Sequence, residues 1–205
     1  MTVKLVDNDL VVGQLQLGKR PAVIAVDFSN AFTHKESLLG GEFASQIEAN
    51  LKLVSAANDH DLPVFFSTVV YDNEKQASVF RQRLPALNIL QRGSHWVDIH
   101  QQFSGYVNTK YLIEKHHPSA FFNTSLASKL LALKVDSLII TGLTTSGCVR
   151  ATCVVGLQHN FLCTVVPEAC GDRNQPAHDM SLHDMHAKYA QILPLTQVLA
   201  YFKSL

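Results

Sequence analysis

Short apolar runs rich in β-branched residues alternate along this chain with segments whose apolar residues recur at the helical period. Helical spacing from Phe43 to Val54 predicts an amphipathic helix over residues 42–60, and a second helix is predicted over residues 146–159. Buried strands are predicted at residues 22–28, 64–70, 136–141 and 161–166. Because such alternation needs crossover connections, it favours a parallel sheet covered on both faces. We expect an α/β fold with a mostly parallel sheet in three α/β/α layers.

Two asparagines refine the expected helix ends. Asn160 is predicted to close the helix over residues 146–159 in a left-handed conformation. Asn123 is predicted to be the N-cap of a helix that runs through Leu126. The weakly patterned segment 71–111 is too long for an ordinary connection, and such segments are usually lids, binding loops or subunit contacts.

The composition is that of a folded domain without a strong charge bias. The chain has 205 residues, 47% of them hydrophobic and 17% charged, which suits one domain over residues 1–205 and argues against disorder. Seventeen Lys plus Arg balance seventeen Asp plus Glu. With no basic block interleaved with aromatic residues, no nucleic-acid partner is expected. No apolar run approaches the roughly 20 residues of a membrane helix, so no membrane partner is expected either.

The N-terminus and the cysteines indicate the compartment. Residues 1–18 alternate apolar and polar residues and lack the apolar core of a signal peptide. The cysteines gather in the last third of the chain, a spacing unlike that of a small disulfide scaffold, and they are Cys148, Cys153, Cys163 and Cys170. We therefore expect a reduced, cytoplasmic protein.

Reactive side chains fall where a doubly wound sheet places its ligand site, at the carboxyl ends of the strands. Asp27 ends the first predicted strand, and Cys148 follows the strand over residues 136–141. A thiol at a helix N-terminus is expected to have a lowered pKa, and Lys115 would stabilise its thiolate. Each residue also has a structural interpretation: Asp27 as a turn former, Lys115 as a solvated charge, and Cys148 as an inert core residue.

Four ordered segments resemble the motifs of the isochorismatase-like cysteine hydrolases, in particular the N-carbamoylsarcosine amidase branch. The resemblance implies an α/β fold of Rossmann type, with a mostly parallel six-stranded sheet between two helix layers. The segments are LTTSGCVRAT at 143–152, AVDFSNAF at 25–32, EKHHPSAFFNT at 114–124, and Gly171-Asp172-Arg173 with His178, Asp184-Met185 and Lys188-Tyr189.

This resemblance assigns a role to individual residues. It implies a catalytic triad of Asp27, Lys115 and Cys148, and a cis peptide between Leu143 and Thr144. The N–H groups of Thr144 and Cys148 would then form the oxyanion hole. Arg173 matches an arginine placed to meet a substrate carboxylate, and it could equally be structural, bridging to Asp172 or to a neighbouring subunit. Candidate substrate-binding residues within the motifs are Arg173, Phe32 and Thr145.

No metal and no other cofactor are expected. The nicotinamidase-like relatives carry a metal site downstream of the catalytic aspartate, and this chain lacks the paired histidines of that site. His178, His183 and His186 are separated by five and three residues, which does not place all of them on one helical face.

The resemblance predicts hydrolysis of a small carbamoyl or carboxamide compound with release of ammonia. Maleamate, biuret or ureidoacrylate hydrolysis is the alternative within the superfamily. A catalytically silent module of the same fold and a thiol redox protein using Cys148 and Cys153 are the alternatives outside it. The i, i+5 spacing of these cysteines disfavours a disulfide within one helix. The resemblance also suggests a homo-oligomer, either a dimer or a tetramer.

Overall fold

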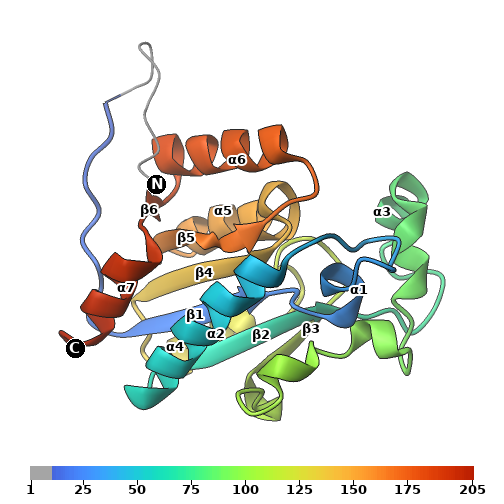
Figure 1. The fold of residues 1–205 in the computed structure, drawn as a ribbon, viewed down its shortest axis with the longest axis horizontal. Helices are drawn as coiled ribbons and strands as arrows, with labels where there is room; N and C mark the ends of the chain where they lie inside the picture. The colour runs from blue at the N-terminus through green and yellow to red at the C-terminus, as the bar shows by residue number, and fades with distance from the viewer. Residues whose placement is uncertain (1–10) are drawn as a thin grey trace.

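The computed structural model describes residues 11–205 and contains a six-stranded sheet in which every strand pair is parallel (Figure 1). The predicted α/β fold is confirmed. The strand order is β3-β2-β1-β4-β5-β6. The bounds are β1 Pro21–Val26, β2 Val64–Val69, β3 Leu112–Lys115, β4 Ser137–Leu143, β5 Leu162–Gly171 and β6 Gln191–Ile192. Expectations for residues 1–10 lie outside the described part of the chain.

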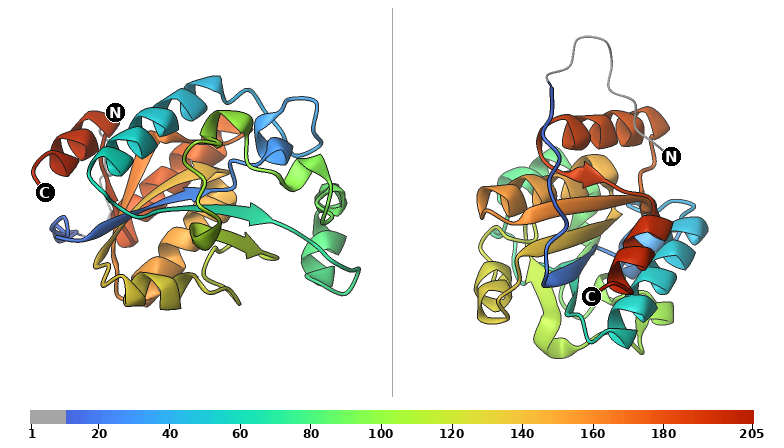
Figure 2. Two further views of the ribbon diagram at one scale, coloured as in Figure 1. Left: turned by 90° about the horizontal axis from the view of Figure 1, so that it is seen from below. Right: turned by 90° about the vertical axis from the view of Figure 1, so that its left-hand side faces the viewer.

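Helices cover both faces of the sheet and form the outer two layers. Two views at right angles show α2 and α7 together on one face, with α4, α5 and α6 on the other (Figure 2). The bounds are α1 Asn30–Thr33, α2 Ala44–Asp59, α3 Ser78–Arg83, α4 Leu126–Ala132, α5 Arg150–Gln158, α6 Gln175–Lys188 and α7 Leu195–Phe202. No helix within residues 11–205 has the length and apolarity that crossing a membrane requires.

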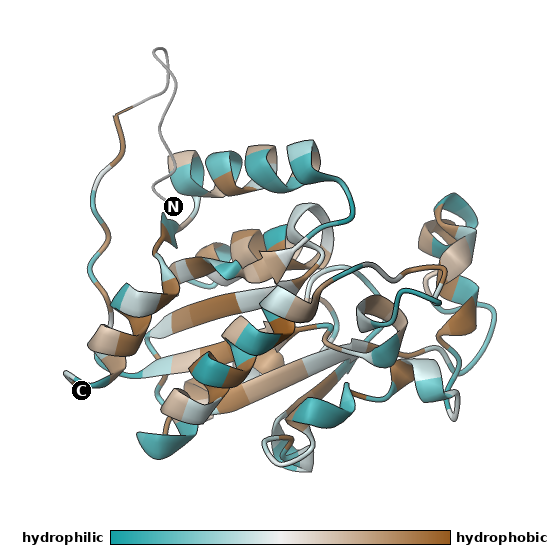
Figure 3. Cartoon of the chain, in the orientation of Figure 1, coloured by the Kyte–Doolittle hydropathy of each residue, from teal (hydrophilic) through white to brown (hydrophobic). Residues whose placement is uncertain are grey.

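The two hydrophobic cores follow from the alternation of side chains along each strand. In β1, Val23 and Ala25 face the core under α2, whereas Ala22, Ile24 and Val26 face the core under α4, α5 and α6. All six β1 residues are buried, as expected for a central strand of a parallel sheet. The strands and the inward helix faces are accordingly the hydrophobic parts of the cartoon (Figure 3).

Some predicted boundaries differ from the structure. Asn160 has a φ of 65°, which confirms its left-handed helix end. The N-cap of α4 is Ser125, so the prediction for Asn123 is wrong, although Asn123 also has a positive φ of 54°. The predicted helix over residues 146–159 begins as a π-helical turn, Thr145–Val149, which leads into α5.

The long segment 71–111 contains one short helix, α3, and four 3₁₀ turns instead of an open loop. In Figure 1, α3 stands away from the sheet at the end where β2 finishes. The turns are Pro85–Ile89, His95–Val97, Gln101–Phe103 and Thr109–Tyr111.

Candidate active site

The carboxyl edge of the sheet brings Asp27, Lys115 and Cys148 together. Asp27 follows β1, Lys115 is the last residue of β3, and Cys148 lies in the turn after β4. Lys115 Nζ lies 2.7 Å from Asp27 Oδ2, and both side chains are fully buried. The Cys148 thiol, in a residue only 8% exposed, lies close enough to both of them for their charges to shift its pKa. Three residues far apart in the sequence thus form one buried cluster of a carboxylate, an ammonium and a thiol.

Asp27 is held in an unusual backbone conformation by β2. Its φ of 53° lies in the left-handed region, which Asp tolerates better than most residues because its short polar side chain can bond locally. The Asp27 N–H donates to Ser67 O at 3.1 Å, and Ser67 Oγ donates to Asp27 Oδ1 at 2.8 Å. Ser67 is 1% exposed. Sequence reasoning did not single out Ser67; the available signal was a hydroxyl residue within the apolar run of β2.

Lys115 is held by two backbone carbonyls as well as by Asp27. Besides the ion pair with Asp27, its Nζ donates to His117 O at 3.1 Å and to Pro118 O at 2.9 Å. Burial lowers the pKa of Lys115, but its interactions with Asp27 first and with Cys148 second outweigh this effect, and the net pKa lies above the usual value. Lys115 is therefore a permanent buried cation beside the thiol.

The turn that carries Cys148 is closed by its own backbone and pinned by Asp172. The Gly147 and Val149 N–H groups both donate to Thr144 O, at 3.0 and 3.2 Å. Asp172 Oδ2 accepts from the Ser146 N–H at 2.9 Å and from Ser146 Oγ at 2.6 Å. The peptide between Leu143 and Thr144 is cis, as predicted.

The acidity of Cys148 differs from the prediction. Burial, followed by the Asp27 carboxylate, raises the pKa of the thiol to about 12, and the Lys115 ammonium offsets only part of the rise. The predicted lowering of the pKa of Cys148 is therefore wrong. The position in the sequence indicated the helix start and the cation, but it did not reveal how deeply the sulfur is buried. At neutral pH Cys148 is therefore a thiol beside the Lys115 ammonium.

Gly142 allows β4 to approach β1 beside Asp27. Its φ is 126°, and a Cβ built there would lie 2.0 Å from Val26 O. No residue with a side chain fits this position without moving the strand that ends at Asp27.

The predicted substrate-binding residues occupy three different environments. Thr145 is fully buried, with Oγ1 2.8 Å from His178 Nδ1, and Phe32 is buried in α1. Arg173 is exposed, and its Nη1 donates to Leu39 O. The alternative Arg173–Asp172 bridge is not observed, because Asp172 bonds the Cys148 turn instead. Substrate contact by these three residues stays a prediction, as do the oxyanion roles of Thr144 and Cys148.

The histidines, and the cysteines other than Cys148, lie outside the cluster of Asp27, Lys115 and Cys148. Within residues 11–205, no group of three or more His, Cys, Asp or Glu side chains is arranged to hold a metal ion. His178, which lies in α6, has its Nδ1 2.8 Å from Thr145 Oγ1. All four cysteines are unpaired thiols, and the ones besides Cys148 are at most 1% exposed. Cys148 is thus the most accessible thiol of the protein.

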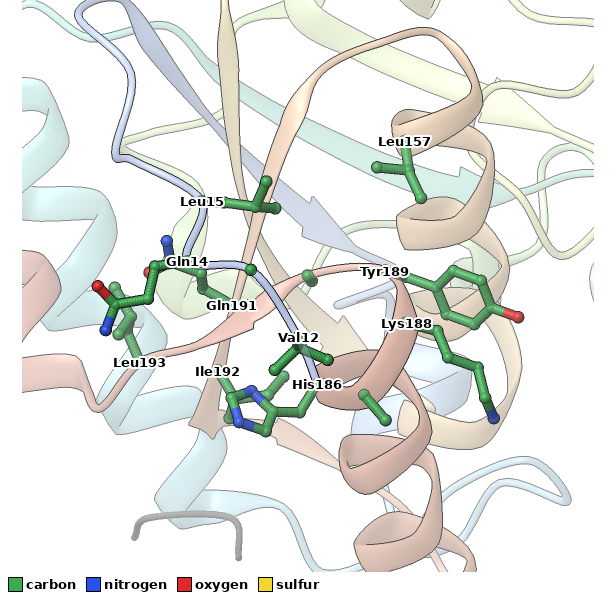
Figure 4. Close-up of a pocket in the computed structure, with 13 residues that line it drawn as sticks. Val12, Gln14, Leu15, Leu157, His186, Lys188, Tyr189, Gln191, Ile192 and Leu193 are labelled. Carbon is green, nitrogen blue, oxygen red and sulfur yellow. The ribbon is translucent and has the colours of Figure 1, made fainter. Parts of the chain in front are cut away.

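A cavity of about 340 Å³ lies elsewhere, between the N-terminal segment and the end of α6 with β6 (Figure 4). Val12 and Leu15 face Ile192 and Tyr189 across it, and His186 contributes its imidazole. None of the three clustered residues lines this cavity, so it is separate from the candidate active site.

Comparison with known proteins gives the family. The model of the isochorismatase domain matches residues 21–197, which include the whole cluster. The chain belongs to the isochorismatase family. It is 30% identical to the N-carbamoylsarcosine amidase of an Arthrobacter species, over 92% of this chain and 73% of that protein. It is 28% identical to the maleamate amidohydrolase of Pseudomonas putida, over 88% of this chain and 85% of that protein.

Solved structures show the same fold at lower sequence identity. A cysteine hydrolase from Pseudomonas syringae pv. phaseolicola aligns with a TM-score of 0.83 at 20% identity, covering 90% of this chain and 93% of that one. The N-carbamoylsarcosine amidase of Thermoplasma acidophilum aligns with a TM-score of 0.72 at 23% identity, covering 86% and 96%. The predicted resemblance to isochorismatase-like hydrolases is confirmed.

Proposed function

We propose that this isochorismatase-family protein is a cysteine-dependent amidohydrolase that cleaves a small carbamoyl or carboxamide compound and releases ammonia. The observation that carries the proposal is the buried Asp27–Lys115 ion pair beside the Cys148 thiol. A nucleophile, a base and a fixed cation in contact are the parts that acyl transfer through a covalent intermediate needs. The amidohydrolase relatives support the same class of reaction.

The first half of the reaction follows from the protonation states. Because the pKa of Cys148 is raised to about 12, the thiol must lose its proton as it attacks, and the adjacent Asp27 carboxylate is the base in reach. A bond forms between Sγ and the carbonyl carbon, and the carbonyl π pair moves to oxygen. Lys115 and the N–H groups of Thr144 and Cys148 stabilise the developing charges. The C–N bond then breaks, and Asp27 returns the proton to the departing ammonia.

Water completes the cycle from the thioester-like intermediate. Asp27 takes a proton from water as the oxygen attacks the acyl carbon, the C–S bond breaks, and the proton passes to Cys148. Every proton that leaves a reacting group is received by Asp27 and given up within the same half-reaction. No metal and no other cofactor take part in this scheme.

The proposed substrate carries a carboxylate beside the cleaved group. Maleamate and N-carbamoylsarcosine, named for the two relatives, both have one. Arg173 offers a guanidinium for two-pronged recognition of such a group. Because Arg173 is exposed and already donates to Leu39 O, it would have to exchange that carbonyl for the substrate. Maleamate, biuret and ureidoacrylate remain the alternatives to N-carbamoylsarcosine within the superfamily, and of these only biuret lacks a carboxylate.

Ammonia release from a panel of small amides and carbamoyl compounds tests the proposal. The panel includes N-carbamoylsarcosine, maleamate, biuret, ureidoacrylate and a simple uncharged amide. Cys148→Ala should abolish release, and Cys170→Ala, which also truncates a buried thiol, should retain it. No release from any compound, or equal release by wild type and Cys148→Ala, would reject the proposed function in favour of a silent module or another chemistry.

A further inference from the structure

We propose that Ser67 is a positioning residue that makes Asp27 Oδ2 the oxygen that takes and returns the proton. The inference rests on the proposed function and assigns a residue of β2 to the same site. Ser67 contacts none of the reacting atoms; it acts by fixing how the carboxylate is presented.

The hydroxyl of Ser67 is both a hydrogen-bond donor and a hydrogen-bond acceptor to Asp27. It has one hydrogen, which it donates to Asp27 Oδ1 at 2.8 Å, and it accepts from the Asp27 N–H at 3.2 Å. Together with the Asp27 N–H bond to Ser67 O, these contacts clamp the backbone and the side chain of a residue in the left-handed region. The carboxylate therefore cannot rotate without breaking a buried hydrogen bond.

As a result, the two carboxylate oxygens of Asp27 have different partners. Oδ1 serves as the acceptor for Ser67, whereas Oδ2 lies 2.7 Å from Lys115 Nζ. Apart from that ion pair, Oδ2 has no nitrogen or oxygen partner within residues 11–205. The oxygen nearest the buried cation is thus the one left open for the thiol proton.

Strand geometry explains why Ser67 can do this and its neighbour cannot. Successive β2 side chains point to opposite faces, so Ser67 shares the face of Phe65 and of the core that contains Cys148. Thr68, equally buried at 3% exposure, points to the other face and donates to Val97 O at 2.7 Å. Ser67 and Thr68 are thus adjacent buried hydroxyl residues of which only Ser67 contacts Asp27. Substitution of Thr68 is therefore a matched control for substitution of Ser67.

The experiment compares Ser67→Ala with Thr68→Val in the ammonia-release assay. Ser67→Ala should lower kcat by about 10- to 100-fold, the range for a hydrogen bond to a charged group, with KM little changed because Ser67 is not in contact with substrate. Thr68→Val should retain kcat within about twofold while it loses some stability. Ser67→Thr keeps the hydroxyl and should recover most of the activity.

The pH profile separates positioning from a purely structural role. Ser67 donates to the ionised carboxylate, so its loss should move the acid limb of the kcat profile to higher pH. The other groups that face Asp27 are Lys115, Cys148 and the neutral phenol of Tyr71, whose pKa the Asp27 charge helps to raise, and all three are unchanged in the variant. If Ser67 were only structural, Ser67→Ala would lower the stability of the protein but leave the acid limb of the kcat profile where it is.

The inference about Ser67 would be overturned if Ser67→Ala kept the wild-type kcat and pH profile. The proposed function would stand in that case, provided that Cys148→Ala is inactive. An active Cys148→Ala would instead reject the proposed function. If Ser67→Ala does not fold by circular dichroism, Ser67→Cys preserves the shape with a much weaker donor and gives the same two readouts.

Discussion

Glu114 and Lys115 are neighbours on β3, yet they belong to charge clusters of opposite character. Glu114 points outward and receives a two-pronged contact from Arg92, at 3.0 and 2.7 Å, while Arg92 also pairs with Asp72. Lys115 points inward to Asp27 at 2.7 Å. The outer Arg92 side chain is 51% exposed, whereas the inner pair is 0% exposed. The contact distances are alike, so the difference between the clusters is their access to water.

Water access decides what each cluster contributes. Exposed ion pairs are screened and have little effect on stability, whereas an unpaired charge left inside a protein is costly. The outer cluster lowers the pKa of Glu114 and Asp72 chiefly through hydrogen bonds from Arg92. The inner cluster raises the pKa of Cys148 chiefly through burial. We therefore expect substitutions in the inner cluster to change both stability and chemistry.

The largest expected effect is that of Lys115→Met. It leaves the Asp27 carboxylate buried without its cation, so the free energy of unfolding should fall by about 3–5 kcal/mol and ammonia release should be lost. Urea denaturation followed by circular dichroism measures the first effect. The double variant Asp27→Asn/Lys115→Met removes both charges, and it should be more stable than Lys115→Met alone. Equal stability of the single variant and wild type would remove the contrast with the outer cluster.

Arg173→Ala examines an exposed arginine that, unlike Arg92, is proposed to meet substrate. A charge-assisted hydrogen bond of about 1.5–3 kcal/mol predicts a loss of about 10- to 150-fold in kcat/KM on substrates that carry a carboxylate. The loss should be much smaller on an uncharged amide, and Arg173→Lys should recover only part of the activity. Steady-state kinetics on both substrate types measure this difference. Equal losses on charged and uncharged substrates would leave Arg173 as a structural donor to Leu39 O.

The raised pKa of Cys148 predicts a specific alkaline loss of stability. An unfolded cysteine ionises near pH ~8.5, and the folded thiol has a pKa of about 12, so the folded state holds the proton more tightly. Its stabilising contribution is complete below about pH 8.5 and falls as the pH rises toward 12. By pH 10 the loss should be about 2 kcal/mol relative to pH 7.

The control for this prediction is Cys148→Ala. Its free energy of unfolding should decrease less steeply between pH 8.5 and pH 10 than that of the wild type, by about the same 2 kcal/mol. Alkylation by iodoacetamide, followed by peptide mapping, adds a kinetic readout: the Cys148 rate should still be rising at about pH 10. A rate that levels off below about pH 8 would show an activated thiolate and contradict the raised pKa.

The sequence predicts the sheet and the three clustered residues better than it predicts their energetics. Apolar runs marked the four central strands, and the family motifs marked Asp27, Lys115 and Cys148. Periodicity did not extend β5 past Val166, because Pro167 interrupts the pattern; the structure places that proline within β5, where the pairing with β4 shifts register. The pKa of Cys148 and the clamp by Ser67 depend on burial and on contacts across 40 residues or more, which motif spacing does not contain.

The smallest expected effect is that of Arg92→Ala in the outer cluster. Arg92 bonds Asp72 and Glu114 and so links the segment that follows β2 to β3, one residue from Lys115. If sequence proximity alone mattered, its loss would disturb Lys115. We expect no measurable change in kcat and a change in unfolding free energy too small to separate from zero at high salt, because solvent already screens these charges. Urea denaturation at low and at high salt, with ammonia release assayed in parallel, measures both. A fall in kcat as large as that of Ser67→Ala would show that the two clusters are mechanically coupled through β3, and that burial alone does not separate them.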